Sequence, residues 1–187
     1  MNHYSNGTIA TDAVPSADLR AFLQQAVDHY PRLAAFSLTL VLPYRKTLAD
    51  YQSLILRFHT DVWQRIGEYS WQRKQARQSS PPTLLRWIWE SLSSPECRMV
   101  LMMNLDTLGT ARSPQLTDSA LEALNAIIVN AWQTLTGTVC AGVTTITPLV
   151  ISRTGRDAFP VPFNQLKTRV QEMTLPVTLA RTGVICL

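Results

Sequence analysis

Residues 83–104, TLLRWIWESLSSPECRMVLMMN, contain two apolar segments separated by a short polar one. The first segment, residues 83–90, and the second, residues 98–104, are rich in aromatic and aliphatic side chains. The residues between them, 93–96, are Ser, Ser, Pro and Glu, which favour a turn. Two such segments that lie a turn apart in the sequence predict a pair of adjacent antiparallel strands.

Two long amphipathic helices are predicted, one before and one after this hairpin in the sequence. In both, apolar side chains recur every three or four residues, which is the spacing of one helix face. The upstream helix begins with a Thr-x-x-Asp capping box at residues 47–50 and ends before the prolines at 81 and 82. The downstream helix begins at the cap Thr117 and ends before Gly137.

Further elements complete the expected order. Residues 35–42 and 139–151 are predicted as strands, a helix is predicted at 16–30 and another at about 161–173, and residues 175–187 form an apolar tail. The central order is therefore strand, helix, strand, strand, helix, strand, which is the split βαβ order of ferredoxin-like and RRM-like sheets. The predicted fold class is α+β, with an antiparallel sheet and both long helices on one face.

The chain of 187 residues is long enough for one globular domain. Residues 1–15 are polar and without a period, so we expect a flexible lead-in and a single domain over 16–187. Charged residues make up only 16% of the chain, which indicates an apolar surface or a partner. The net charge of +4 is compatible with nucleic-acid binding. Because neither a signal peptide nor a membrane span is recognised, we expect a cytoplasmic protein.

Local spacing predicts neither a metal site nor a nucleophile. None of the three histidines has another histidine or a cysteine within four residues, and the three cysteines are widely separated. Cys97 is expected to be a small buried thiol rather than a nucleophile. The sequence has no phosphate-binding glycine motif and no serine-hydrolase motif, so we expect no cofactor, and no small-molecule ligand is indicated.

Basic residues close to aromatic residues form the candidate nucleic-acid site. They occur near Trp71 at the end of the first long helix, beside Trp87 and Trp89, and on both sides of Gly155. These basic residues are Arg73, Lys74, Arg77, Arg86, Arg153 and Arg156. On a sheet, bases can stack on aromatic rings while phosphates meet the cations. Trp87 and Trp89 share one strand face, which is either part of the core or a stacking platform.

Four short segments, 38–43, 85–90, 101–104 and 131–137, follow one another in a recognisable order. With this order the chain resembles the YagK/YfjJ proteins of prophages and their inovirus replication-protein relatives, over roughly residues 33–183. In that family the strand that ends in Asn carries a His-x-His pair, similar to the metal-binding signature of rolling-circle initiators. A Tyr-Leu-Ala-Lys stretch follows the last helix. The resemblance implies a metal-bound scissile phosphate that is attacked by a tyrosine.

This chain departs from the family pattern at the positions that carry the chemistry. Counting back from Asn104, the two histidine positions fall on Glu96 and Arg98, and Thr178 occupies the place of the tyrosine. An arginine cannot ligate a metal, and no tyrosine follows Tyr69. We therefore expect these motif positions to be degenerate and the protein to be a pseudoenzyme.

Three functions are compatible with this scaffold. The first is a catalytically inactive replication-initiator-like protein of a prophage or mobile element, which binds DNA, in single-stranded or hairpin form, in replication or its regulation. The second is a protein-interaction module of a mobile element that docks a host, phage or toxin partner. The third is an active metal-dependent DNA-nicking enzyme with shifted ligands, Glu96 and Asp106. A steep salt dependence of DNA affinity would favour the first, because phosphate contacts release counterions.

Overall fold

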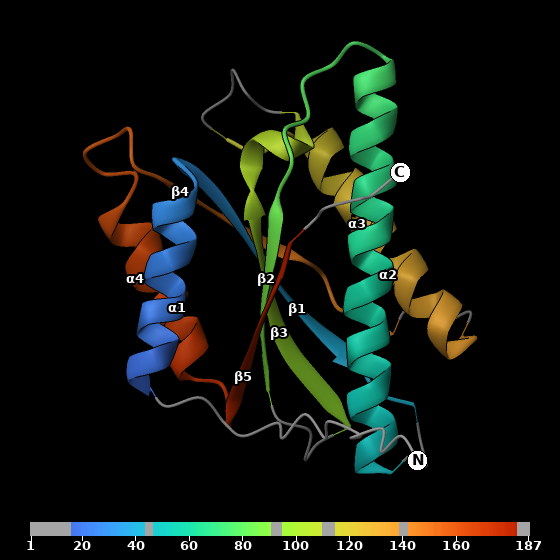
Figure 1. Ribbon diagram of the computed structural model, residues 1–187. Coiled ribbons are helices and arrows are strands. Elements are labelled where there is room, and N and C mark those ends of the chain that lie inside the picture. The colour runs from blue at the N-terminus through green and yellow to red at the C-terminus, as the bar shows by residue number, and fades with distance from the viewer. Residues whose placement is uncertain (1–15, 44–46, 91–94, 110–114, 139–141, 183–187) are drawn as a thin grey trace, which may run out of the picture.

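A single sheet lies between two layers of helices in the computed structural model (Figure 1). The structure describes residues 16–43, 47–90, 95–109, 115–138 and 142–182. Its elements, in chain order, are α1 (Ser16–His29), β1 (Arg32–Val41), α2 (Leu48–Gln75), β2 (Leu84–Glu90), β3 (Glu96–Asn104), the 3-10 helix η1 (Leu105–Leu108), α3 (Asp118–Thr136), β4 (Thr147–Ser152), α4 (Pro160–Gln171) and β5 (Pro176–Thr182).

The sheet has the strand order β4-β1-β3-β2-β5, and every neighbouring pair is antiparallel. The order β4-β1-β3-β2 is that of a split βαβ sheet, so the predicted α+β, ferredoxin-like architecture is confirmed. The predicted apolar tail is wrong for Pro176–Thr182, which forms β5 along the free edge of β2. A long-range pairing decides this, and the local sequence pattern does not contain it. Residues 183–187 lie outside the described part of the chain.

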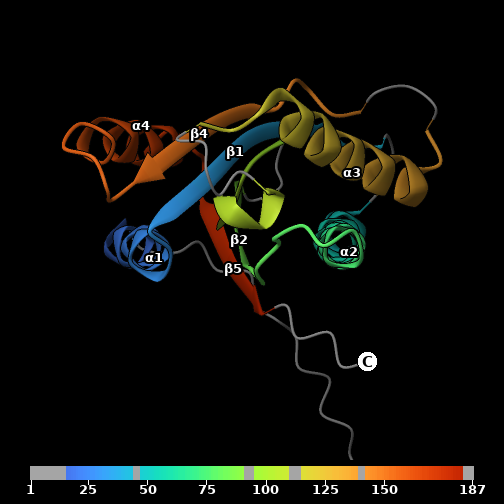
Figure 2. The same ribbon diagram turned by 90° about the horizontal axis from the view of Figure 1, so that it is seen from above.

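The two long helices begin and end where the sequence predicts. The Thr47 hydroxyl accepts a hydrogen bond from the Asp50 amide, and the Asp50 carboxylate accepts one from the Thr47 amide, both at 3.2 Å. The Thr117 hydroxyl caps α3, and Gly137 ends it with a φ of +68°. α2 and α3 pack against each other and cover the same face of the sheet, as expected (Figure 2).

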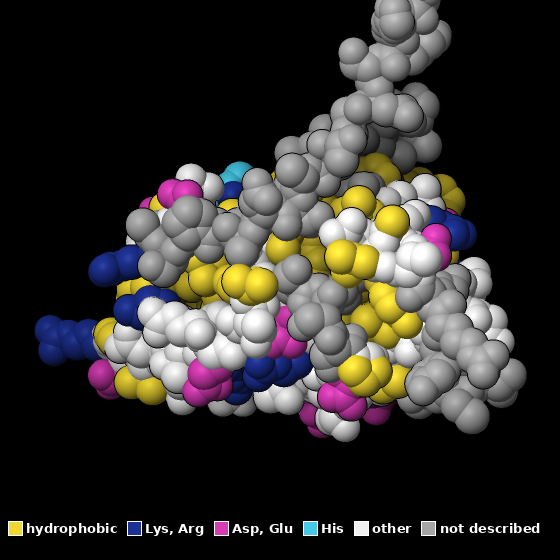
Figure 3. All heavy atoms as spheres, turned by 90° about the horizontal axis from the view of Figure 1, so that it is seen from below, with side chains coloured by type: hydrophobic (Ala, Val, Ile, Leu, Met, Phe, Trp, Pro, Cys, Tyr) yellow, Lys and Arg dark blue, Asp and Glu magenta, His cyan; other side chains and the backbone are white. Residues whose placement is uncertain are grey.

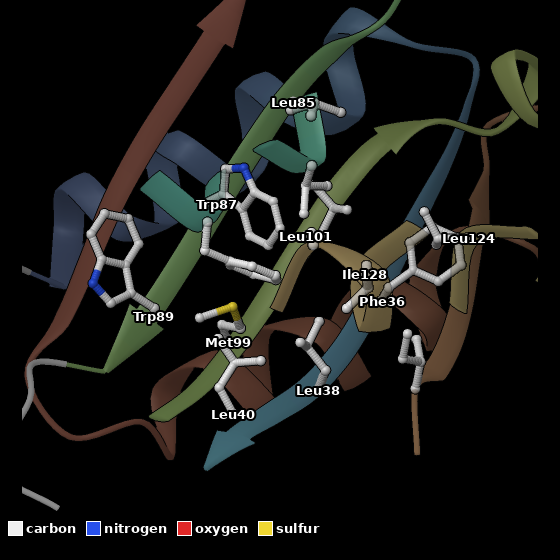
Figure 4. Packing of buried hydrophobic residues seen from close by; sticks show 14 of the residues in the cluster. Phe36, Leu38, Leu40, Leu85, Trp87, Trp89, Met99, Leu101, Leu124 and Ile128 are labelled. Carbon is white, nitrogen blue, oxygen red and sulfur yellow. The ribbon is translucent and has the colours of Figure 1, made fainter. Parts of the chain in front are cut away.

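Alternation along the strands divides the sheet into two apolar faces. Successive side chains point to opposite sides of a strand. Phe36, Trp87 and Trp89 therefore face α2 and α3 (Figure 4), whereas Ile88 and Val100 face α1 and α4. Trp87 and Trp89 are 0% and 5% exposed. Both tryptophans belong to the core under α2 and α3, so neither acts as a stacking platform for bases. The other face of the sheet is covered as well, by α1 and α4.

The strand predicted at 139–151 is shorter in the structure. Only Thr147–Ser152 forms β4, and Val143 makes an isolated bridge with Leu40. Pro148 cannot donate a ladder hydrogen bond, which is consistent with its position in an edge strand. Residues 139–141, like the lead-in predicted at 1–15, lie outside the described residues. None of the helices described is long and apolar enough to cross a membrane.

Candidate nucleic-acid interface

Most of the predicted basic residues lie at one end of the sheet, which we call the upper end because it is at the top of Figure 1. β1 and β2 begin at the upper end, and β3 and β4 finish there. The register shows this directly, because Arg32 pairs with Ser152 and Leu33 pairs with Asn104. The Asn104 amide also donates to the Thr83 hydroxyl, just before β2, at 2.9 Å.

The end of α2 is anchored to the upper end by hydrogen bonds. Ser80 Oγ donates to the Thr107 carbonyl at 2.7 Å, and Ser70 Oγ donates to the Ser80 carbonyl at 3.1 Å. Tyr69 donates from its hydroxyl to the Leu108 carbonyl at 3.3 Å. These contacts hold the last turns of α2 against the segments that enter β2 and leave β3.

Arg73, Lys74 and Arg77 all lie at this end of α2, but they differ in surroundings. The Arg73 guanidinium lies 5.7 Å from the Tyr69 ring centroid and directly against Gly109, where an added Cβ would be 1.9 Å from Nη2. Lys74 and Arg77 are exposed. Arg73 therefore contributes to the packing of the upper end, and Lys74 and Arg77 supply its accessible charge.

Arg153 and Arg156 belong to the loop between β4 and α4, at the same end. Both side chains are exposed. The loop is fixed at its start, because the Arg153 amide donates to the Pro31 carbonyl and the Ser152 amide donates to the Ala158 carbonyl, each at 3.0 Å. The structure thus brings these two arginines to the same end of the sheet as Lys74 and Arg77.

Arg86 differs from the other five because its side chain is buried at 6% exposure. It points from β2 toward the α1 and α4 layer, and its Nη2 lies 3.4 Å from His29 Nδ1. Burial lowers the pKa of Arg86, and the neighbouring Tyr30 partly opposes this shift. In the described part of the chain, the Nε and Nη1 atoms of Arg86 have no hydrogen-bond partner. This position corrects the expectation that Arg86 meets phosphates at the rim of the sheet.

The degenerate motif positions lie at the opposite, lower part of the sheet. Glu96 and Arg98 lie at the start of β3, and Thr178 lies on β5 in register with Ile88. Arg98 and Thr178 occupy the same face of the sheet, with β2 between their strands. Seen from below, the described surface shows both acidic and basic side chains among many apolar ones (Figure 3).

The shifted metal ligands considered for a nicking enzyme are far apart. Glu96 begins β3, whereas Asp106 lies two residues beyond its last residue, Asn104. A strand of this length separates them by about 30 Å. Asp106 accepts a hydrogen bond of 2.8 Å from Arg32 Nη1. Glu96 and Asp106 therefore cannot hold the same ion.

A small cavity of about 250 Å³ lies on the lower part of the sheet, under the end of α4. Arg98 and Arg169 line it together with several Ser and Thr residues, and Arg169 Nη1 donates to Ser37 Oγ at 3.2 Å. Two acidic residues offset the two arginines, because Glu172 also lines the cavity and Glu90 pairs with Arg98. The charge of this cavity is therefore balanced, in contrast to that of the upper end.

A larger cavity of about 490 Å³ lies beside the second half of α2, close to the start of β2. In the sequence, Trp71 stands out only as a neighbour of basic residues, and this cavity was not predicted. The available signal is the spacing of Trp63, Gly67, Trp71 and Lys74 at four, four and three residues, which places them on one face of α2. The residues that line it are Trp63, Ile66, Gly67, Glu68, Ser70, Trp71, Lys74, Pro82, Thr83, Leu85 and Thr107.

The fold and this end of the sheet define an α+β protein with a five-stranded antiparallel sheet between two helix layers. The chain belongs to the family described as uncharacterised conserved protein UCP030791, whose family model matches residues 9–146. The matched range includes both long helices and the α2 side of the upper end, and it ends before β4. No curated protein matches the sequence.

Proposed function

We propose that the protein is a catalytically inactive, replication-initiator-like protein of a prophage or mobile element that binds DNA through the upper end of the sheet. The observation that carries this proposal is that four exposed cations from two distant segments lie at the same end of the sheet. Lys74 and Arg77 come from the end of α2, and Arg153 and Arg156 come from the loop after β4. We call these four residues the cation cluster, and cations at one end of a sheet can contact several phosphates of one nucleic-acid backbone.

The geometry of the sheet supports contact with more than one phosphate. β4 and β2 are three strand spacings apart in the sheet, which corresponds to about 14 Å. α2 lies on one side of the sheet and the β4 to α4 loop on the other (Figure 2). A short stretch of nucleic-acid backbone that crosses the upper end would therefore meet cations on both sides.

The resemblance to prophage YagK/YfjJ proteins supports the choice of DNA as the partner. It also supports the loss of catalysis, because Arg98 replaces an expected histidine and its guanidinium is engaged with Glu90. Thr178 has a hydroxyl but not the phenol that the resemblance implies for attack on the phosphate. These substitutions favour a protein that retains DNA binding without cleaving the strand.

The proposal is tested by fluorescence anisotropy with a labelled DNA hairpin that has a single-stranded loop. We expect Lys74→Ala/Arg77→Ala and Arg153→Ala/Arg156→Ala each to weaken binding several-fold. The control Arg20→Ala/Arg57→Ala removes the same charge from exposed positions on α1 and α2, outside the upper end, and is expected to have a much smaller effect. Equal losses in all three variants would contradict the proposed surface.

Two further outcomes would overturn the proposal. If no DNA binds at low salt and the protein instead forms a stable complex with a host, phage or toxin protein, the protein-interaction function replaces it. If Mg²⁺ or Mn²⁺ supports cleavage of the DNA strand, and Glu96→Ala abolishes that cleavage, the protein is an active nicking enzyme.

A further inference from the structure

We propose that the cavity beside α2 holds one unstacked base of the bound DNA, so that the protein prefers single-stranded DNA to duplex. This inference rests on the proposed function and assigns a role to residues that the cation cluster does not use. The cavity lies at the upper end, and Lys74 both lines it and belongs to the cation cluster. A strand that contacts Lys74 and Arg77 therefore passes the mouth of the cavity.

The size and walls of the cavity suit a nucleobase. Its volume of about 490 Å³ falls within the range of roughly 300–1,000 Å³ that is usual for small-ligand sites. Trp63, Ile66 and Trp71 form the α2 wall, and Pro82 and Leu85 form the wall on the β2 side. These walls are apolar on both sides, as a flat aromatic ligand requires.

Trp71 is the more exposed of the two tryptophans that line this cavity, because Trp63 is half-buried. It is 54% exposed, whereas Trp87 on the neighbouring strand is 0% exposed. An exposed indole beside cations is the arrangement by which single-strand binding proteins stack bases and contact phosphates. Duplex DNA keeps its bases stacked inside the helix, so it cannot use Trp71 without base flipping.

The polar groups of the cavity narrow the choice of base. The Ser70 and Thr107 hydroxyls already donate to the Ser80 and Pro81 carbonyls, at 3.1 and 2.7 Å. Glu68 and Lys74 also line the cavity, and neither side chain makes a hydrogen bond or ion pair with another residue of the described chain. A carboxylate accepts hydrogen bonds from exocyclic amino groups, as Glu and Asp do from cytosine. Glu68 therefore favours an amino-bearing base over thymine, which has no amino group.

The first test measures, for wild-type protein and for each variant, the affinities for single-stranded and duplex DNA of the same length. We expect Trp71→Ala to lower the ratio of single-strand to duplex affinity by about 5- to 150-fold, which corresponds to the loss of one stacked base. Trp71→Phe keeps a ring and should retain most of the ratio. Leu48→Ala is a matched control, because Leu48 is equally exposed, at 54%, but lies at the other end of α2.

The second test addresses Glu68 with oligo(dC) and oligo(dT). Wild-type protein is expected to bind oligo(dC) more tightly than oligo(dT). Glu68→Gln is expected to reduce this preference for oligo(dC) more than it changes the mean affinity for the two oligonucleotides. Thermal unfolding of each variant shows whether its fold is intact.

The outcomes separate this inference from the proposed function. If the Lys74→Ala/Arg77→Ala variant loses affinity but Trp71→Ala keeps the wild-type ratio, DNA binding at the upper end stands and the base pocket is wrong. An equal loss on single strand and duplex in Trp71→Ala also contradicts the pocket. If wild-type protein binds no DNA, both proposals fail.

Discussion

Arg98 on β3 donates a hydrogen bond from its Nε atom to the carboxylate of Glu90 on β2, at 2.9 Å. Its Nη2 atom also donates to the Glu172 carbonyl beyond α4, at 2.9 Å. The same Glu90 carboxylate accepts from the backbone amides of Arg98 and Thr174, at 3.4 and 3.0 Å. The carboxylate thus joins both hairpin strands to the segment that leads into β5.

Replacement of this carboxylate should make stability less dependent on pH. Burial works to raise the pKa of Glu90, but its hydrogen bonds with Arg98 and the Thr174 amide prevail and lower it below the ordinary glutamate value. The stabilisation of the fold by ionised Glu90 is therefore complete at pH values above the ordinary glutamate pKa of the unfolded chain. It is lost as the pH falls through the lowered pKa of the folded protein. We expect Glu90→Gln to lower the free energy of unfolding by about 1–3 kcal/mol at neutral pH, as expected for lost charged hydrogen bonds.

Urea unfolding from about pH 7 to about pH 2 measures both effects. Wild-type protein should lose more stability than Glu90→Gln on the acid side, so the two curves converge as pH falls. Parallel curves across this range would show that Glu90 does not contribute in this way.

The two tryptophans Trp87 and Trp71 should respond very differently to truncation. Trp87→Ala removes a fully buried indole that contacts Phe58 and His59, with ring centroids 5.8 and 4.2 Å away. We expect a loss of about 3–5 kcal/mol in unfolding free energy. Trp71→Ala alters a half-exposed side chain and should cost less than about 1 kcal/mol. Equal losses in denaturant unfolding would contradict the separation of core and accessible tryptophans.

Two glycines with positive φ form a matched pair at helix ends. Gly137 has a φ of +68° and open space around it, whereas Gly109 has a φ of +86° and faces the Arg73 guanidinium. Gly137→Ala should cost about 1–2 kcal/mol through backbone conformation alone. Gly109→Ala should cost more, because Arg73 must move.

A double-mutant cycle with Arg73→Ala isolates this contact. In the Arg73→Ala background, Gly109→Ala should cost about as much as Gly137→Ala. If the cost of Gly109→Ala is the same with and without Arg73, the guanidinium does not pack against this glycine.

The thiol of Cys97 should be chemically inert in the folded protein. Burial is the main cause that raises its pKa to about 12, and the negative charge of Glu90 adds to this effect. At a pH of about 8 almost no thiolate is present, so iodoacetamide should leave Cys97 unmodified until urea unfolds the chain. Peptide mass spectrometry distinguishes Cys97 from the other two cysteines. Rapid alkylation of Cys97 in native protein would contradict a structural role for it.

The central fold could be predicted because its signals are local. The capping box at Thr47 begins the first long helix and the left-handed stop at Gly137 ends the second. The polar residues between the two apolar segments of 83–104 predict the hairpin. β5 could not be predicted in the same way. Its residues, Pro176–Thr182, become a strand only because β2 has a free edge beside them.

The interface could be predicted only in part, for a related reason. Lys74 and Arg77 are conspicuous in sequence beside Trp71, but their position at the same end of the sheet as Arg153 and Arg156 depends on the strand order. Arg86 alternates with Trp87 and so points to the opposite face of the sheet. Its burial depends on the packing of α1 and α4 over that face, which no local pattern encodes.

The salt dependence of DNA affinity tests the central claim most directly. Binding of a single-stranded oligonucleotide is measured from about 50 to about 200 mM salt for wild-type protein and for the Lys74→Ala/Arg77→Ala/Arg153→Ala/Arg156→Ala variant. Each lost phosphate contact lowers the slope of log affinity against log salt by about 0.7 for a single strand. We predict a slope shallower by about 2–3 in the variant. Equal slopes in the two proteins would contradict binding through the upper end of the sheet.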